Sequence, residues 1–269
     1  MSLLDPVKHA LSAVLAATHD ALTTVGAAPD SATTWVLSIA VLVLLVRLAV
    51  LPLVVHGVRQ AHSAARARPH LKEIAERYRG RTDADSVRAQ LEERRSVSAE
   101  HGVSRLGCLP LLVQLPVWLA LYHLLADAAA GVPVGAMDSA MVSSLGAASV
   151  LGVSLAVHGY LGSGGAHLTV VAGLALTAAA LSYVTQRFVV ATNTVTEGMP
   201  EAVVTAQRVV PVLSAGGMLL AGGVVPVALL VYWVCSSTWT LGQSAAIARW
   251  WPTPGTSAAL RRQRSRPAS

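Results

Sequence analysis

Arg47 is the residue with the clearest chemical potential in this chain, because it lies inside a long apolar segment. The segment runs from Thr34 to Val55 and contains no other charged residue. About 20 apolar residues cross the hydrocarbon core of a bilayer, and an arginine in that core costs at least about 2.5 to 3.5 kcal/mol. A charged residue at that depth therefore indicates a functional site. The alternative is that Arg47 only extends to the interface, although about 12 Å of helix separates it from Val55.

Other polar side chains lie in later apolar segments, and none of them is a carboxylate. Membrane-buried polar groups need partners and usually face the interior of a bundle or a wet cavity. Because no aspartate or glutamate can pair with Arg47 there, we expect water or a visiting acidic group as its partner. The same absence argues against a proton-coupled transporter. Hydrogen bonding between helices is the structural alternative for each of Gln114, Ser182, Gln186, Ser236, Ser237, Thr238, Thr240 and Gln243.

Motifs for enzymatic, metal or nucleotide chemistry do not occur. Cys108 and Cys235 lie in apolar surroundings and are interpreted as small buried hydrophobes. The histidines are scattered without an HExxH pattern or a Cys/His cluster, and neither GxGxxG nor GxxxxGK[ST] is present. The serines near Ser236 have no neighbouring base, and His123 and His158 are distant candidates. We therefore expect neither an enzyme nor a cofactor nor a metal site.

The composition is that of a protein that crosses a membrane several times. Of its 269 residues, 54% are hydrophobic and only 13% are charged, whereas soluble domains carry about 25% charged residues. The net charge of +6 is concentrated beside apolar segments: eleven of the twenty basic residues lie between His56 and Leu106, and five follow Ile247. The positive-inside rule explains this distribution without nucleic acid.

Charge distribution and segment length predict an all-α polytopic membrane protein with five transmembrane helices. Residues 127–166 contain two acidic residues and no basic ones, which places them opposite the basic loops. A sixth span over 145–161 would separate the two basic regions, so we exclude it. The predicted spans are 34–55, 107–126, 167–187, 208–223 and 225–246, the last two forming a tight hairpin. The loops are 56–106, 127–166 and 188–207, followed by the basic tail 247–269, with the N-terminus outside and the C-terminus cytoplasmic.

Two further helical regions are predicted outside the spans. Residues 1–33 show apolar positions at helical spacing and are interpreted as an external amphipathic helix at the membrane interface. A signal peptide cleaved near Ala28 is the competing interpretation. Residues 56–106 form a cytoplasmic helical hairpin around Gly80, with Thr82 or Asp83 able to cap the second helix.

From Arg47 to the tail, the chain resembles the YidC/Oxa/Alb family of membrane protein insertases. The resemblance is to the shorter bacterial type without a large external domain. The phrases that carry it are VRLAVLPLVVHGVRQ (46–60), RPHLKEIAERYRGR (68–81), EHGVSRLGCLPLLVQLPVWLALYHLL (100–125), YVTQR (183–187), VVPVALLVYWVCSSTWTLGQ (224–243) and PTPGT (252–256).

The resemblance implies a five-helix fold with a hydrophilic groove that is open to the cytoplasm and to lipid and binds the substrate. Arg47, Gln186 and Trp233 match residues that line this groove. Gln114 matches the polar position between the two prolines of the second span. Ser237 and Gln243 are secondary candidates in the last span.

The implied function is insertion of membrane proteins into the bacterial plasma membrane, without a nucleotide. The implied clients are nascent membrane proteins, with the ribosome, the Sec translocon and membrane lipids as further candidate partners. Ser237 stands where the family usually carries asparagine, the second cytoplasmic loop has only AQR (206–208), and a glycine-rich stretch occupies 214–223. These departures leave open a divergent paralogue with narrowed clients, and a small anion-binding transporter or channel is the other alternative.

Overall fold

The computed structural model describes residues 4–103, 109–162, 165–196, 199 and 201–264, which are almost entirely helical. Both cysteines are interpreted from the sequence as buried hydrophobes. Cys108 lies outside the described residues, whereas Cys235 is a half-buried free thiol. The helices and strands, in chain order, are α1 (Asp5–Thr24), α2 (Ala32–Ala49), α3 (Leu51–Arg77), α4 (Ala84–Glu100), α5 (Leu109–Ala129), α6 (Ser139–Ala147), β1 (Ser149–Val150), β2 (Val153–Ser154), α7 (Gly165–Val184), the π-helix η1 (Thr185–Val190), the 3-10 turn η2 (Ala191–Asn193), α8 (Glu201–Gly222), α9 (Val227–Trp250) and α10 (Ser257–Arg264).

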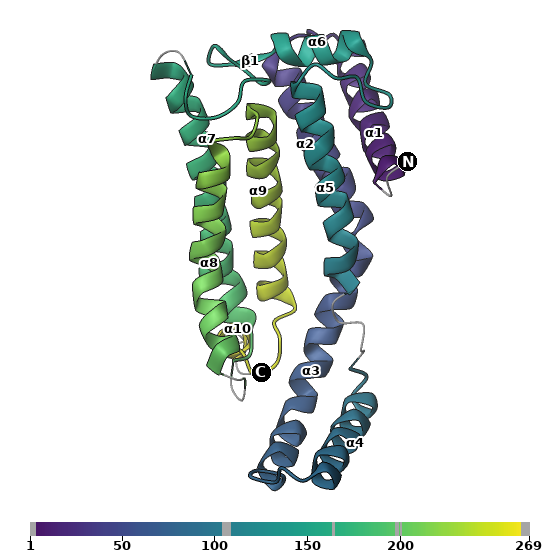
Figure 1. Ribbon diagram of the computed structural model, residues 1–269, viewed down its shortest axis with the longest axis vertical. Coiled ribbons are helices and arrows are strands. Elements are labelled where there is room, and N and C mark those ends of the chain that lie inside the picture. The colour runs from purple at the N-terminus through teal and green to yellow at the C-terminus, as the bar shows by residue number, and fades with distance from the viewer. Residues whose placement is uncertain (1–3, 104–108, 163–164, 197–198, 200, 265–269) are drawn as a thin grey trace.

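Five long helices, α2, α5, α7, α8 and α9, form an elongated bundle (Figure 1). Helix α9 is its central member, because it packs against α2, α5 and α7. Its first seven residues, Val227 to Trp233, are all buried. Helix α8 packs against α7 and exposes most of its apolar side chains.

Four stretches of helix are long and apolar enough to cross a membrane within the described part of the chain. They are Ala32–Ala49, Leu112–Ala129, Gly165–Asn193 and Glu201–Gly222, with mean hydropathy between 1.4 and 2.1. The prediction of an all-α membrane protein is thus confirmed. Helix α9 is longer than a bilayer requires, but its middle contains the polar residues Ser236, Ser237, Thr238, Thr240, Gln243 and Ser244. A fifth span therefore stays a prediction.

The connection between α8 and α9 is short, yet the two helices do not form the tight hairpin predicted from its length. Helix α8 packs on α7, while α9 packs on α7, α2 and α5. The start of α9 is held instead by the loop before α7. Pro226 has no N–H group, and the first free N–H groups of α9, on Val227 and Ala228, donate to the carbonyls of Val157 (3.0 Å) and Leu155 (2.9 Å).

A proline separates the first long apolar segment from the basic hairpin. Helix α2 ends at Ala49, and α3 begins at Leu51 with Pro52 in its first turn. Pro52 has no N–H group to donate to the carbonyl of Leu48, four residues earlier, so the helical hydrogen bonding is interrupted there. Arg47 consequently lies in the last turn of α2 and not near the middle of a longer helix.

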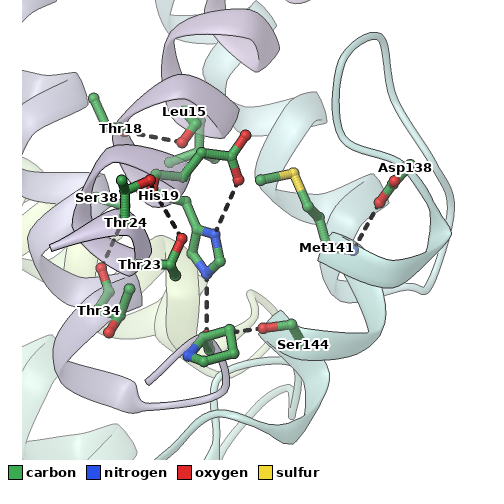
Figure 2. A network of polar contacts seen from close by, with 12 residues as sticks. Leu15, Thr18, His19, Thr23, Thr24, Thr34, Ser38, Asp138, Met141 and Ser144 are labelled. Atoms are coloured by element: carbon green, nitrogen blue, oxygen red, sulfur yellow. Dashed lines mark hydrogen bonds and ion pairs between the residues drawn. The ribbon is translucent and has the colours of Figure 1, made fainter. Parts of the chain in front are cut away.

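Helix α1 packs its apolar face against α2 and α5, which bury Leu11 and Leu15. Its position relative to a membrane stays a prediction. At its C-terminal end, the buried His19 ring lies 4.4 Å from the Trp35 ring, and its Nε2 is 3.0 Å from the Pro29 carbonyl (Figure 2). Trp35 Nε1 donates to Ser144 Oγ (3.1 Å), which donates to the same carbonyl (2.9 Å). This network joins α1, α2 and α6.

The basic hairpin and the C-terminal helix α10 lie at the same end of the bundle, and α6 and the β1–β2 hairpin lie at the other end (Figure 1). Asp83 caps α4 by accepting a hydrogen bond from the Ser86 N–H (2.9 Å), which lowers the pKa of its carboxyl. Tyr78 donates to Glu93 Oε1 (3.0 Å), a bond that raises the pKa of the phenol. The two helices of the hairpin are therefore joined by side chains as well as by their turn.

Candidate functional site

Arg47 is half-buried and points across the bundle toward α9. Its Nη2 atom donates to Ser236 Oγ over 2.7 Å. Its place in the last turn of α2 is favourable for a cation, because the helix macrodipole is negative at that end. The hydrogen bond satisfies only one of the five N–H groups of the guanidinium. The other four N–H groups of the guanidinium therefore need water or an acidic ligand as hydrogen-bond acceptors.

The guanidinium lines a cavity of about 510 Å³, bounded by α2, α5, α8 and α9. This volume is within the usual range of ligand sites, about 300 to 1,000 Å³. Helix α8 packs on α7 and not closely on α5, so the cavity occupies the space between α5 and α8. Its walls are Arg47, Gln114, Leu115, Trp118, Ser214, Gly217, Met218, Ala221, Tyr232, Trp233, Ser236 and Ser237.

The wall residues repeat at helical spacing on each helix. On α8, Ser214, Gly217, Met218 and Ala221 follow the i, i+3, i+4, i+7 pattern of one face. The small residues among them leave open the space that bulkier side chains would fill. The glycine-rich stretch 214–223 thus shapes the cavity. The α8 wall was not predicted, although the spacing of its residues is visible in the sequence.

The α9 wall shows the same periodicity around the two serines. Trp233, Ser236 and Ser237 lie at i, i+3 and i+4, and Tyr232 adds a second i, i+4 pair with Ser236. Sequence reasoning named Ser237 as the groove candidate and gave Ser236 no specific role. Ser236 is nevertheless the residue that holds Arg47. The i, i+3 spacing from Trp233 is the signal that could have found it.

Four of the predicted groove residues, Arg47, Gln114, Trp233 and Ser237, line this one cavity. The other two do not line it. Gln186 lies in the π-helix η1 and donates to Ser182 Oγ (3.1 Å), an interaction within its own helical segment.

Gln243 lies on a different hollow of α9. It accepts a hydrogen bond from Trp239 Nε1 (2.7 Å) and lines a separate, largely apolar hollow of about 730 Å³ between α2 and α9. The native thiol of Cys235 lines the same hollow. Gln243 is therefore not positioned to act together with Arg47.

The cavity is cationic, because no acidic side chain belongs to its walls. Among the described residues, no carboxylate forms an ion pair with Arg47. The described part of the chain also contains no cluster of three or more His, Cys, Asp or Glu side chains that could hold a metal. The arrangement can bind an acidic group at one end while Leu115, Trp118 and Met218 contact an apolar segment.

Comparison with known proteins gives consistent matches along most of the chain. Residues 27–253 match the family model described as 60Kd inner membrane protein. Three relatives carry the name membrane protein insertase YidC. The one from Streptomyces avermitilis is 31% identical over 85% of this chain and 54% of its own length. Those from Bifidobacterium longum and Tropheryma whipplei are 25% and 29% identical, over 97% and 98% of this chain and 80% and 89% of theirs.

The chain thus spans about half the length of the Streptomyces relative and most of the other two. The resemblance described from the sequence phrases is confirmed by these matches. The relatives' shared name denotes a membrane protein insertase.

Proposed function

The chain belongs to the 60Kd inner membrane protein family, the YidC/Oxa/Alb family, and from that premise we propose that it inserts the transmembrane segments of client proteins into the bacterial plasma membrane. One observation carries the proposal from the family to this chain. Arg47, hydrogen-bonded to Ser236, lies on the wall of a cavity that four helices share and that has no acidic wall residue.

The first step is capture of an acidic client tail. Arg47 keeps water in the cavity and attracts the carboxylates of a short tail that must cross the membrane. Two unit charges 4 Å apart interact by about 4 kcal/mol at an effective dielectric constant of 20. This attraction offsets part of the cost of moving a carboxylate out of bulk water. Ser236 holds the guanidinium at the cavity wall, so little side-chain ordering is needed when the tail arrives.

The second step is passage of the client's apolar segment into lipid. Leu115, Trp118 and Met218 give the cavity an apolar side that a client's hydrophobic segment can contact. Transfer of the client's hydrophobic segment from water into lipid lowers its free energy. The membrane potential adds about 2.3 kcal/mol per elementary charge per 100 mV for charges that cross it. No covalent step and no nucleotide is required.

The proposed orientation places the basic hairpin and the tail in the cytoplasm and α6 outside. It follows from the positive-inside rule and from the position of α3, α4 and α10 at one end of the bundle (Figure 1). We propose α9 as the fifth span, since its 24 residues exceed the length that a bilayer requires and its Ser236 side chain meets Arg47 inside the bundle. Nascent membrane proteins are the proposed clients. The ribosome, the Sec translocon and membrane lipids are further candidate partners.

Reconstitution separates an insertase from an anion channel. The purified full chain is placed in liposomes and given a single-span client with a short acidic tail, and the protected tail is measured after protease digestion. In parallel, flux of chloride and phosphate is recorded from the same liposomes. We expect protection of the tail without anion flux. Flux without protection would assign the cavity to an anion channel instead.

A further inference from the structure

A second cavity, with a different wall chemistry, lies where α10 folds back onto the bundle. Its volume is about 430 Å³, and η1, η2, the end of α9 and α10 bound it. Three of its wall residues are arginines, Arg249, Arg261 and Arg262. It lies apart from the Arg47 cavity, with which it shares no wall residue.

The elements that bound this cavity carry basic but no acidic side chains. The sequences of η1, η2, α9 and α10 contain no aspartate or glutamate. Arg187, whose guanidinium carbon is 5.8 Å from the centroid of the Phe188 ring, adds a fourth cation beside the wall. Arg262 also donates to the carbonyl of Trp250 over 2.6 Å, which fixes one arginine against the end of α9. An anion entering here meets several cations, one of which is held in place by the end of α9.

Hydrogen bonds hold α10 in this position. The Thr253 N–H donates to Asn193 Oδ1 (2.8 Å), and Ser257 Oγ donates to the carbonyl of Thr192 (3.0 Å). Ala258, the first residue of α10 on the cavity wall, is buried. The basic tail, as far as Arg264, therefore folds back against η2 and does not extend away from the bundle.

Apart from Thr192, the remaining wall residues are apolar, and two of them lie at the end of a candidate membrane span. Phe188 and Val189 belong to the stretch Gly165–Asn193, and Phe188 is 59% exposed. Trp250 and Trp251, at the end of α9, are 57% and 59% exposed. Exposed aromatic residues of this kind are typical of the membrane–water interface. The ligand that suits both walls carries an anionic head and an apolar body.

We propose that this cavity binds the phosphate group of an anionic phospholipid, with Arg249 and Arg261 on the phosphate and the acyl chains against Phe188. Basic pockets at the ends of transmembrane helices recognise anionic headgroups in this way. Ribosomal RNA also carries phosphates, but the apolar wall and the folded-back tail favour lipid. The bound lipid would fix the bundle end to the inner leaflet independently of clients.

The test uses the full chain in detergent and titrates it with short-chain phosphatidylglycerol, phosphatidylcholine and inorganic phosphate, with bound ligand counted by native mass spectrometry. The variant Arg249→Gln/Arg261→Gln removes two wall cations. Its matched control, Arg208→Gln/Arg264→Gln, removes two exposed arginines outside the cavity and gives the same net charge. Arg249→Lys/Arg261→Lys keeps the charge. A thermal unfolding scan checks that each variant is folded.

We expect phosphatidylglycerol to bind in preference to phosphatidylcholine and inorganic phosphate. The wall variant should bind phosphatidylglycerol about 30-fold more weakly, because each basic residue near an anionic lipid usually changes the affinity about fivefold. The affinities of the control and of the lysine variant should stay within about threefold of the unmodified chain. Equal losses in the wall variant and its control would reduce the effect to net charge and overturn the proposal. Equally strong binding of inorganic phosphate, or wall-dependent sedimentation with ribosomes without lipid binding, would also overturn it.

Discussion

Replacement of Arg47 should separate the cost of this residue to the fold from its benefit to function. Arg47→Ala removes a charge-assisted hydrogen bond to Ser236, worth about 1.5 to 3 kcal/mol. It also removes the cost of an arginine at membrane depth, about 2.5 to 3.5 kcal/mol. The two contributions nearly cancel. The two ranges differ by at most about 2 kcal/mol, so for a chain of this size we expect the thermal unfolding midpoint to change by no more than about 8 °C.

Insertion should respond far more strongly than stability. The attraction between Arg47 and one client carboxylate is at most about 4 kcal/mol at 4 Å, or about three orders of magnitude in transfer rate. Arg47→Lys keeps the charge but cannot reproduce the planar donor pattern, so we expect intermediate activity. Ser236→Ala leaves the charge in place without its anchor, and we expect a smaller loss than for Arg47→Ala.

The assay follows insertion into liposomes of two clients that differ only in the tail. One tail carries aspartates, and in the other each aspartate is replaced by asparagine. Because the proposed attraction is electrostatic, Arg47→Ala should impair the acidic client and change the neutral one little. Equal impairment of both clients would refute the charge-pairing step, and unchanged insertion of the acidic client would remove Arg47 from the mechanism.

Three further outcomes test other parts of the structure. Trp35→Ala removes a fully buried side chain at the α1–α2–α6 network and should lower the unfolding midpoint by roughly 6 to 20 °C, whereas Trp250→Ala, at an exposed position, should change it little. The depressed pKa of Asp83 means that its capping of α4 is present at neutral pH and is lost as pH falls through that pKa, so circular dichroism of the full chain should show partial loss of helix only in strong acid, and Asp83→Ala should remove this transition. Gln114→Ala should reduce insertion more than Gln186→Ala, because Gln114 lines the Arg47 cavity and Gln186 does not; the reverse order would count against this cavity as the client site.

Much of the fold was predictable because apolar length and charge distribution are properties of the sequence alone. The Arg47 segment, the Asp83 cap and the all-helical class follow from them. The separation of α8 from α9 does not follow from the sequence in this way. A short connection limits the distance between the ends of two helices but not the direction of their axes. That direction depends on the contacts of α9 with α2, α5 and α7, which are long-range packing.

The candidate site was only partly predictable for a related reason. Arg47 and Gln114 are conspicuous as polar residues in apolar segments, and Trp233 came from the family resemblance. Ser236 and the α8 wall are composed of small residues that are common in any membrane helix. Only their position opposite Arg47 distinguishes them, and that position depends on how four helices meet.

Crosslinking to a client is the most direct measurement of the central claim that the Arg47 cavity receives client segments. In a chain whose native Cys108 and Cys235 are replaced by serine, single cysteines are placed at Ser214, on the cavity wall, and at Val212, which is 60% exposed on the same helix and lines no part of the cavity. A cysteine in the transmembrane segment of a ribosome-stalled client reports contact through disulfide formation. We expect the client to crosslink strongly at position 214 and weakly at position 212. Equal crosslinking at both positions, or crosslinking at 212 alone, would contradict a client path through this cavity.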